Sequence, residues 1–275
     1  MTQAMPEKAA PAAKRAEGGV QSIGRAMSIL DRLAETDIGL TLTELARGVA
    51  LPPSTTHRIL TTLQRYRFVR FDGASMTWQI GVQAFVVGNV FARSRDVASL
   101  ATPHLRRLMG RTGETVNYFT HSGDAVVCMT QVQSQQMVRA ISRPGISSEM
   151  HRSAAGKAIL AHMEASEVNE IIARTGLRRY TENTITTLED LHLELGKIRQ
   201  RGFSIDNEEF SLGLRCIAAP IFDEAGAVQA AISLAGPASR IAEARVENLG
   251  ATVAHCAHSV TAEIGGKAPP LTQQA

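Results

Sequence analysis

The sequence predicts an α+β fold in two parts, a helical N-terminal part and a C-terminal part that mixes helices and strands. Up to about residue 80, apolar residues recur at helical spacing and end in a hairpin signal. Beyond that point, helical segments are interspersed with apolar strand-like runs. The length of 275 residues is also sufficient for two ordinary domains.

The N-terminal part is predicted to contain three helices and a hairpin. Thr41-x-x-Glu44 is a capping box that opens the second helix, and a Pro-Pro pair at 52–53 precedes the third. Asp72-Gly73 between two strand-like runs is a hairpin signal. Helix, capped helix, helix and hairpin in about 60 residues are typical of a winged helix-turn-helix. The apolar spacing of the first helix rests on Val20, Ile23, Met27, Leu30 and Leu33.

The third helix is expected to turn a polar, basic face outward. Between residues 45 and 70 the chain has five arginines and no Asp or Glu, the charge pattern of a phosphate-binding surface. Arginine can contact guanine through two hydrogen bonds, and free N–H groups at a helix start can hold a phosphate. A solvated basic helix is the alternative. The residues predicted to contact DNA are Ser54, Thr55, His57, Arg58, Thr61 and Arg65.

Changes in composition give the predicted domain limits. The winged helix-turn-helix covers residues 20–80, a linker helix covers 81–95, and a second domain covers 96–265. The remaining segments, 1–19 and 266–275, have no hydrophobic period and are expected to be disordered tails.

Turn and cap signals separate the elements of the second domain. Ser122-Gly123-Asp124 predicts a hairpin turn, Ser153 predicts a helix start, and Gly202 predicts the end of a longer helix. Two apolar runs joined by Glu224-Ala225-Gly226 predict core strands, and an apolar stripe predicts a final helix. An antiparallel sheet with helices packed on it often encloses a small ligand.

The stretch EMHRSAAGKAIL, residues 149–160, looks at first like half of a phosphate-binding loop. Such a loop needs an earlier Gly and a later hydroxyl, but this chain has His151 and Ala158 there. What remains is a helix N-terminus capped by Ser153, with small residues that let an anion approach the backbone. Close packing of the helix start is the alternative. Lys157 is expected to face away from such a site.

Metal-binding and catalytic interpretations have less support. His255 and His258 lie three residues apart and could share a metal, but packing and surface exposure explain them better. The acidic loop with Asp206, Glu208 and Glu209 could be catalytic, yet no matched nucleophile and base accompany it. We therefore expect no enzyme, no metal and no cofactor.

Cysteine usage and hydropathy bear on the compartment. The three cysteines are widely spaced and odd in number, which fits a reducing compartment. No apolar run reaches the ~18 residues of a membrane span, and no secretory segment is found at the N-terminus. A cytoplasmic protein without a membrane partner is expected.

The residues resemble the IclR-type transcriptional regulators from Ile23 to about Gly265. In the first domain the likeness rests on LPPSTTHRILTTL, FVR and WQIG, and in the second on HRSAAGKAILA, GFSIDNEEFSLGLRCIAAPIFD and AAISLAGPASRI. The resemblance implies a winged helix-turn-helix, a linker helix and a GAF-like effector domain. It also implies a homodimer, often paired into a tetramer, that binds double-stranded DNA at a palindromic operator.

Within the family, the branch that senses glyoxylate and pyruvate is the most similar. This branch often has a second Ser where this chain has Ala235, and often a Gly in the small-residue pair, so one hydroxyl is lost and the entry is narrower. Carried over by motif, the effector contacts are the backbone N–H groups of Ala154 and Ala155 and the side chains of Asp206, Cys216 and Ser233.

The predicted function is therefore a transcriptional regulator whose operator affinity depends on a small carboxylate effector. Glyoxylate or a similar two- to three-carbon oxoacid is preferred, because Asp206 could accept a hydrogen bond from the hydroxyl of a hydrated aldehyde. A sensor of an aromatic or larger organic acid is the alternative, and an oxoacid-metabolising enzyme is a remote one. Both repressors and activators occur in the family, so the sign of regulation stays open.

Overall fold

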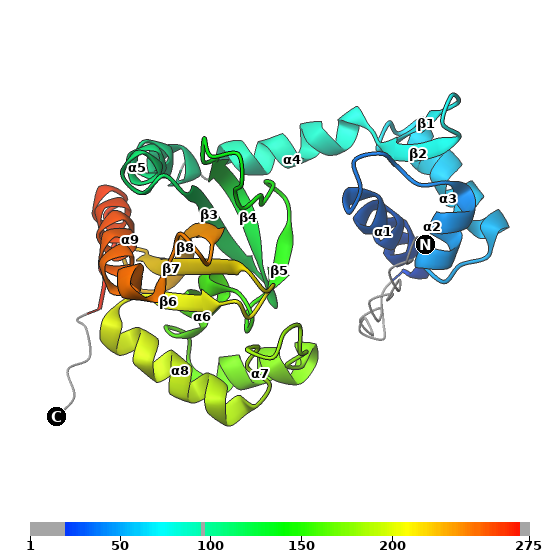
Figure 1. Cartoon of the computed structure of the whole chain (residues 1–275). Coiled ribbons are helices and arrows are strands. Elements are labelled where there is room, and N and C mark those ends of the chain that lie inside the picture. Colours follow the sequence, from blue (N-terminus) through cyan, green and yellow to red (C-terminus); the bar gives the residue numbers. More distant parts are fainter. Residues whose placement is uncertain (1–19, 95–96, 270–275) are drawn as a thin grey trace, which may run out of the picture. The chain divides into compact units, whose positions relative to one another are not determined.

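The chain folds into two compact units, Met1–Arg95 and Asp96–Ala275, each with its own hydrophobic core (Figure 1). The computed structural model describes residues 20–94 and 97–269. A helical unit with a small hairpin precedes an α/β unit, so the predicted fold class is confirmed.

The predicted disordered tails fall mainly beyond the described part of the chain. Residues 1–19 and 270–275 lie outside the described residues. Four residues of the expected C-terminal tail, 266–269, are described and have no regular secondary structure. Two of them are held to the domain, because the N–H groups of Gly266 and Lys267 donate to the carbonyl oxygens of Thr261 (2.7 Å) and Asp223 (2.9 Å).

The N-terminal unit contains the predicted helices and hairpin. The Thr41 hydroxyl accepts the N–H of Glu44, and the Glu44 side chain accepts the N–H of Thr41, so the capping box is present. Buried apolar residues such as Ile29, Leu45 and Leu60 join the three helices in one core. The elements are α1 (Gln21–Ala34), α2 (Leu42–Gly48), α3 (Pro53–Arg65), β1 (Val69–Asp72), β2 (Thr77–Ile80) and α4 (Val82–Ser94).

Two local features of this unit differ from the simplest expectation. In α1, only the C-terminal part of the apolar stripe is buried, because α2 and α3 cover that end of the helix. Val20, Ile23 and Met27, in the N-terminal part, are exposed. The hairpin loop has four residues, since Asp72 pairs with Thr77 and the Asp72 carboxylate accepts the N–H of Ala74 inside the loop.

The C-terminal unit is built on a six-stranded antiparallel sheet in the order β5-β4-β3-β8-β7-β6. The strands are β3 (Thr115–Ser122), β4 (Ala125–Val132), β5 (Ser147–Glu149), β6 (Ser204–Asn207), β7 (Leu214–Phe222) and β8 (Val228–Pro237). The helices are α5 (Val97–Thr112), α6 (Ala154–Leu160), α7 (Ala165–Thr175), α8 (Leu188–Arg201) and α9 (Glu243–Glu263).

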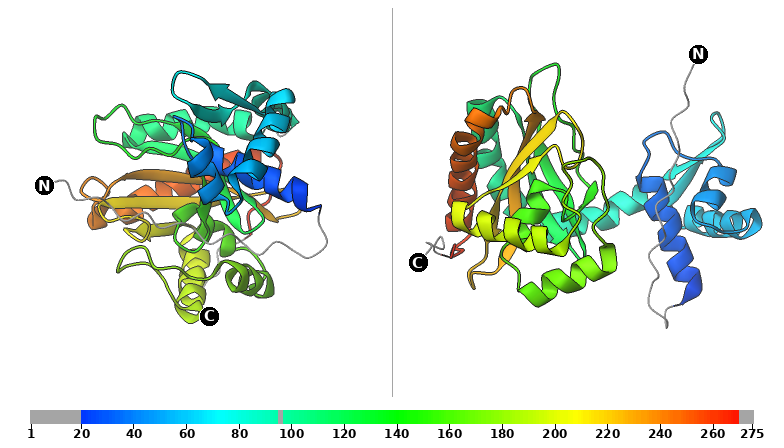
Figure 2. Two further views of the ribbon diagram at one scale, coloured as in Figure 1. Left: turned by 90° about the vertical axis from the view of Figure 1, so that its right-hand side faces the viewer. Right: turned by 60° about the horizontal axis from the view of Figure 1, so that its bottom comes forward.

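Helices cover both faces of this sheet. Helices α5 and α9 pack on one face, and α6, α7 and α8 lie on the other (Figure 1, Figure 2). Along β7 and β8, alternate residues serve the two cores: Ile217 and Leu234 face α9, while Ala218 faces α6. The α6 face of the central strands is therefore lined by small residues.

Segment 204–207 is a strand, although the sequence was interpreted as an acidic loop there. β6 forms the edge of the sheet and pairs Asp206 with Cys216 on β7. A four-residue polar strand shows no clear alternation of its own, so its pairing is fixed by the longer strand beside it. No helix within residues 20–94 and 97–269 is both long and apolar enough to cross a bilayer.

Candidate functional site

The exposed face of α3 carries the residues predicted to contact DNA. Five of the six are exposed, and Thr55 is half-buried. No side chain caps the start of α3, so its first N–H groups lack an intrahelical acceptor. The His57 ring lies edge-on to Trp78 with 6.4 Å between ring centres, which links this face to the hairpin. Free donors at one end and arginines along the face suit a helix that enters a major groove.

A second candidate site begins at the N-terminus of α6. The Ser153 hydroxyl accepts the N–H of Gly156 at 3.0 Å, so Ser153 is the predicted cap. Ala154 and Ala155 are buried, yet their N–H groups have no hydrogen-bond acceptor among the described residues. Buried N–H groups without a partner are rare in proteins, and here they point out of a helix start that favours negative charge.

The sheet beneath α6 supplies the side chains predicted to complete this site. Cys216 on β7 pairs with Asp206 on β6. Two residues further along β7, Ala218 pairs with Ser233 on β8. Ser204 on β6 also pairs with Ala218. Its hydroxyl lies within hydrogen-bond distance of the carbonyl oxygens of Ala154 (2.6 Å) and Ala218 (3.2 Å). The five predicted effector contacts therefore lie around the first turn of α6 and the strands beneath it.

Burial dominates the electrostatics of Asp206 and Cys216. Burial raises the pKa of the Asp206 carboxyl, although Lys157 and the N–H groups of Glu209 (2.8 Å) and Phe210 (3.2 Å) act in the opposite direction. Burial also raises the pKa of the Cys216 thiol well above its usual range, and the neighbouring Asp206 adds to the rise. The thiol is therefore protonated at neutral pH and can act as a hydrogen-bond donor.

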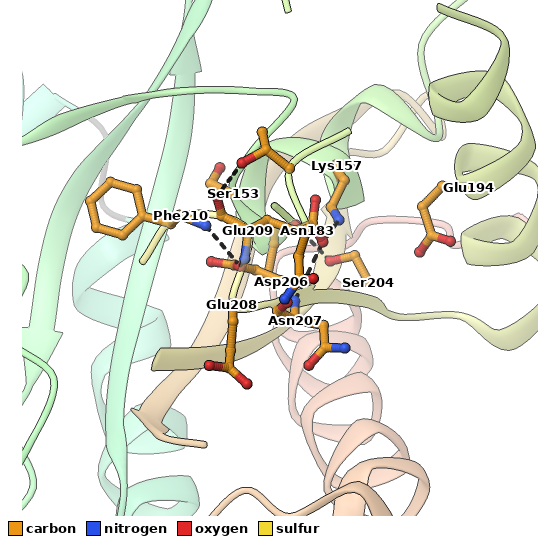
Figure 3. Close-up of polar contacts among 12 residues, drawn as sticks. Ser153, Lys157, Asn183, Glu194, Ser204, Asp206, Asn207, Glu208, Glu209 and Phe210 are labelled. Carbon is orange, nitrogen blue, oxygen red and sulfur yellow. Dashed lines mark hydrogen bonds and ion pairs between the residues drawn. The ribbon is translucent and has the colours of Figure 1, made fainter. Parts of the chain in front are cut away.

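Lys157, expected to face away from the anion site, is buried. All seven residues of α6 are buried, and Lys157 is only 1% exposed. Its ammonium group forms an ion pair with the buried carboxylate of Glu209, whose second oxygen has no partner among the described residues (Figure 3). Burial raises the pKa of Glu209 to about 7, even though Lys157 opposes the rise. A charged residue is tolerated in this helix because a segment 52 positions later supplies its counter-ion.

Gly156 has a steric role in the same stretch. A Cβ at this position would lie 2.3 Å from the carbonyl oxygen of Met150, far inside van der Waals contact. The Gly-Lys pair that suggested a phosphate loop is thus explained by a close backbone approach and a buried ion pair.

Two further residues border the site and were not singled out in the sequence. The Arg152 guanidinium lies between two aromatic rings, 3.9 Å from the centre of Tyr180 and 4.3 Å from that of Phe210. Asn117 pairs with Ser233 across the sheet and accepts a hydrogen bond from Gln131 at 2.9 Å. The nearby sequence does not mark either residue as part of a site, because the side chains that surround each of them come from segments distant in the sequence.

Comparison with known proteins follows the same division of the chain. A model described as the IclR helix-turn-helix domain matches residues 22–73, and one described as bacterial transcriptional regulator IclR, C-terminal, matches residues 90–262. The transcriptional repressor IclR of Escherichia coli is 43% identical over 94% of this chain and 95% of that protein. The acetate operon repressor of Salmonella typhimurium is 42% identical over 90% of this chain and 92% of that protein.

A solved structure is similar along most of the chain as well. The crystal structure of the Thermotoga maritima IclR has a TM-score of 0.68 and 29% sequence identity, and the match covers 89% of this chain and 98% of that one. The likeness therefore extends over both units.

Proposed function

Since the chain belongs to the IclR family of bacterial transcriptional regulators, we propose that it is a repressor whose operator affinity is set by a small carboxylate. The observation that carries the effector part is the pair of unpartnered N–H groups at Ala154 and Ala155, above Asp206 and Cys216. The protein would work in the cytoplasm, where bacterial DNA lies. Because the family consists of regulators, we do not retain the enzyme alternative.

DNA recognition is assigned to α3. Arg58 and Arg65 lie on its exposed face with Thr61 between them, one and two turns along the helix. The Thr61 hydroxyl donates to the His57 carbonyl at 2.9 Å, which leaves its lone pairs free to accept from a base or a water. Ser54 and Thr55 would hold a phosphate at the helix start.

A homodimer fits exposed apolar residues in the N-terminal unit. Val20 and Ile23 on α1 are 65% and 58% exposed, and Phe85 on α4 is 70% exposed. Large apolar side chains exposed in this number on one unit are consistent with a protein–protein interface. Two copies related by a two-fold axis would read a palindromic operator, and pairing of dimers into a tetramer is part of the same proposal.

The effector is proposed to be glyoxylate or a similar two- to three-carbon oxoacid. The ligand carboxylate would accept hydrogen bonds from the N–H groups of Ala154 and Ala155. Cys216 and Ser233 would face the aldehyde or keto group of the ligand. The pKa of Asp206 is raised by burial, which favours the neutral carboxyl and so reduces its repulsion of a carboxylate ligand. When ionised, Asp206 could instead accept a hydrogen bond from the hydroxyl of a hydrated aldehyde.

Regulation then follows from linkage between the two sites. An effector that binds one arrangement of the dimer more tightly shifts the population of arrangements that fit the operator. A coupling free energy of about 1–3 kcal/mol would change DNA affinity roughly 5- to 150-fold.

The DNA assignment is tested by a mobility-shift titration with the operator. Arg58→Ala should weaken binding by about 1–3 kcal/mol, the usual value of a good base contact. Lys197→Ala is the matched control, because it removes one exposed positive charge from α8 in the other unit. Equal affinities for Arg58→Ala and Lys197→Ala would refute the role of α3.

The effector assignment is tested by calorimetric titration with glyoxylate, pyruvate and benzoate. Glyoxylate should bind wild type, and Ser233→Ala should weaken that binding by about 0.5–1.5 kcal/mol through loss of a hydrogen bond. Benzoate binding that is tighter than that of glyoxylate and is weakened in Ser233→Ala would favour the sensor of a larger or aromatic acid. No heat with any short oxoacid at millimolar concentration would refute the proposed pocket chemistry.

A further inference from the structure

A separate cavity of about 580 Å³ lies in the C-terminal unit, and none of the five proposed effector contacts lines it. It borders β7 beyond the end of β6, since β6 pairs only with residues 215–218 and leaves 219–222 without a described strand on that side. The C-terminal end of α8 and the second half of α9 form its other walls. Its volume is within the range of drug-sized ligand sites and larger than a three-carbon acid requires.

The charged side chains that line this cavity are basic, and no Asp or Glu is among its described lining residues. Arg201 is already engaged, because it donates to Glu194 and to the carbonyl of Phe203. Arg199 donates to the carbonyl of Ala161 at 2.9 Å, and no carboxylate in the described part of the chain lies within ion-pair distance of it. A cation without a counter-ion at the wall of a cavity attracts an anion.

Apolar and aromatic side chains form part of the remaining lining. Pro220 and Phe222 of β7 contribute apolar surface, and the His162 ring stands edge-on to Phe222 with 4.9 Å between ring centres. Burial lowers the pKa of His162 to about 4, helped by Arg199, so its ring is neutral at physiological pH. His258 on α9 is exposed and lines the opposite side. A flat apolar body can pack against the outer surface of this ring pair, because aromatic groups favour edge-to-face and offset contacts.

We propose that this cavity is a second small-molecule site, which takes a planar organic anion such as an aromatic carboxylate. The carboxylate lies at Arg199 and His258, and the ring lies against Phe222 and His162. The site is independent of the proposed oxoacid site, so one molecule of each ligand binds at the same time.

The test uses isothermal titration of the full chain with 2-naphthoate and with the neutral 2-naphthamide, which has the same shape. Naphthoate should bind with one site per chain and at least tenfold more tightly than the amide. Arg199→Ala should lower naphthoate affinity at least tenfold, whereas Lys197→Ala, two residues earlier on α8, should leave it unchanged. His258→Ala provides a second variant if melting curves show that Arg199→Ala is unfolded.

Two further arms separate this site from the proposed oxoacid site. Ser233→Ala should bind naphthoate as wild type does, and saturating glyoxylate should not compete with it. Equal binding of acid and amide, loss of naphthoate binding in Ser233→Ala with retention in Arg199→Ala, or no binding at millimolar concentration would each overturn the proposal. A failure of glyoxylate to bind leaves these readouts unaffected.

Discussion

Replacing Lys157 by methionine removes the only cation that pairs with Glu209 among the described residues while keeping most of the side-chain volume. The Lys157 and Glu209 side chains are 1% and 7% exposed, so water cannot take over the lost interaction. Removing one partner of a buried ion pair costs about 3–5 kcal/mol, because the other charge stays buried. We expect a loss of this size in the free energy of unfolding at pH 8.

The pKa of Glu209 gives a second way to estimate the loss in the free energy of unfolding. A rise from 4.5 to about 7 with Lys157 still present corresponds to a penalty of about 3 kcal/mol on the charged form. Without Lys157, the carboxyl can avoid that penalty by binding a proton. The destabilisation should therefore be smaller at pH 5.5 than at pH 8, and the double variant with Glu209→Gln should recover at least half of it.

Urea unfolding followed by circular dichroism measures this effect in the C-terminal unit. The chain has one tryptophan, Trp78, which lies in the N-terminal core, so tryptophan fluorescence reports the other unit as an internal control. We expect the fluorescence transition to stay in place while the C-terminal transition shifts. A loss below about 1 kcal/mol for Lys157→Met, or no recovery with Glu209→Gln, would refute the account of a buried ion pair.

The other predictions concern four single positions. A Cβ at Gly250 would lie 2.4 Å from the Phe203 ring, so Gly250→Ala should lower the urea midpoint by the equivalent of about 1–3 kcal/mol. Gly196→Ala on α8 meets no atom closer than 3.9 Å and should instead raise stability by up to ~1 kcal/mol; the reverse order would contradict the packing argument. Thr41→Ala removes the capping box of α2 and should shift the fluorescence transition by about 1 kcal/mol, unless the cap is dispensable. Because the pKa of Glu209 is raised in the folded state, its contribution to stability is present below pH 4.5 and is lost as pH rises through about 7. In Glu209→Gln, the free energy of unfolding should therefore depend less on pH, as measured by unfolding curves between pH 4.5 and 8.

Local signals were sufficient to predict much of the fold. The Thr41 capping box, the Ser153 cap and the Gly202 helix end each depend on residues within a few positions, and all three are found where the sequence places them. The long apolar runs of β7 and β8 were recognisable for the same reason.

Features set by distant partners could not be predicted in this way. From the sequence near it, Lys157 would be taken for a surface residue. It is buried because Glu209, 52 positions later, pairs with it. Segment 204–207 looks like an acidic loop until β7 pairs with it. The cavity beside Arg199 is formed by segments from distant parts of the sequence, among them β7, α8 and α9, that are adjacent only in the folded unit.

The alternation along β8 has a consequence for how such a sensor can change over evolutionary time. Ser233 faces α6, whereas the adjacent Leu234 belongs to the core under α9. In the proposed oxoacid site, the residue that would contact the effector therefore alternates along β8 with residues that pack under α9. Ala235 faces the same side as Ser233. At the proposed site, side-chain changes at Ser233 or Ala235 would reach the ligand without altering Leu234, which packs under α9.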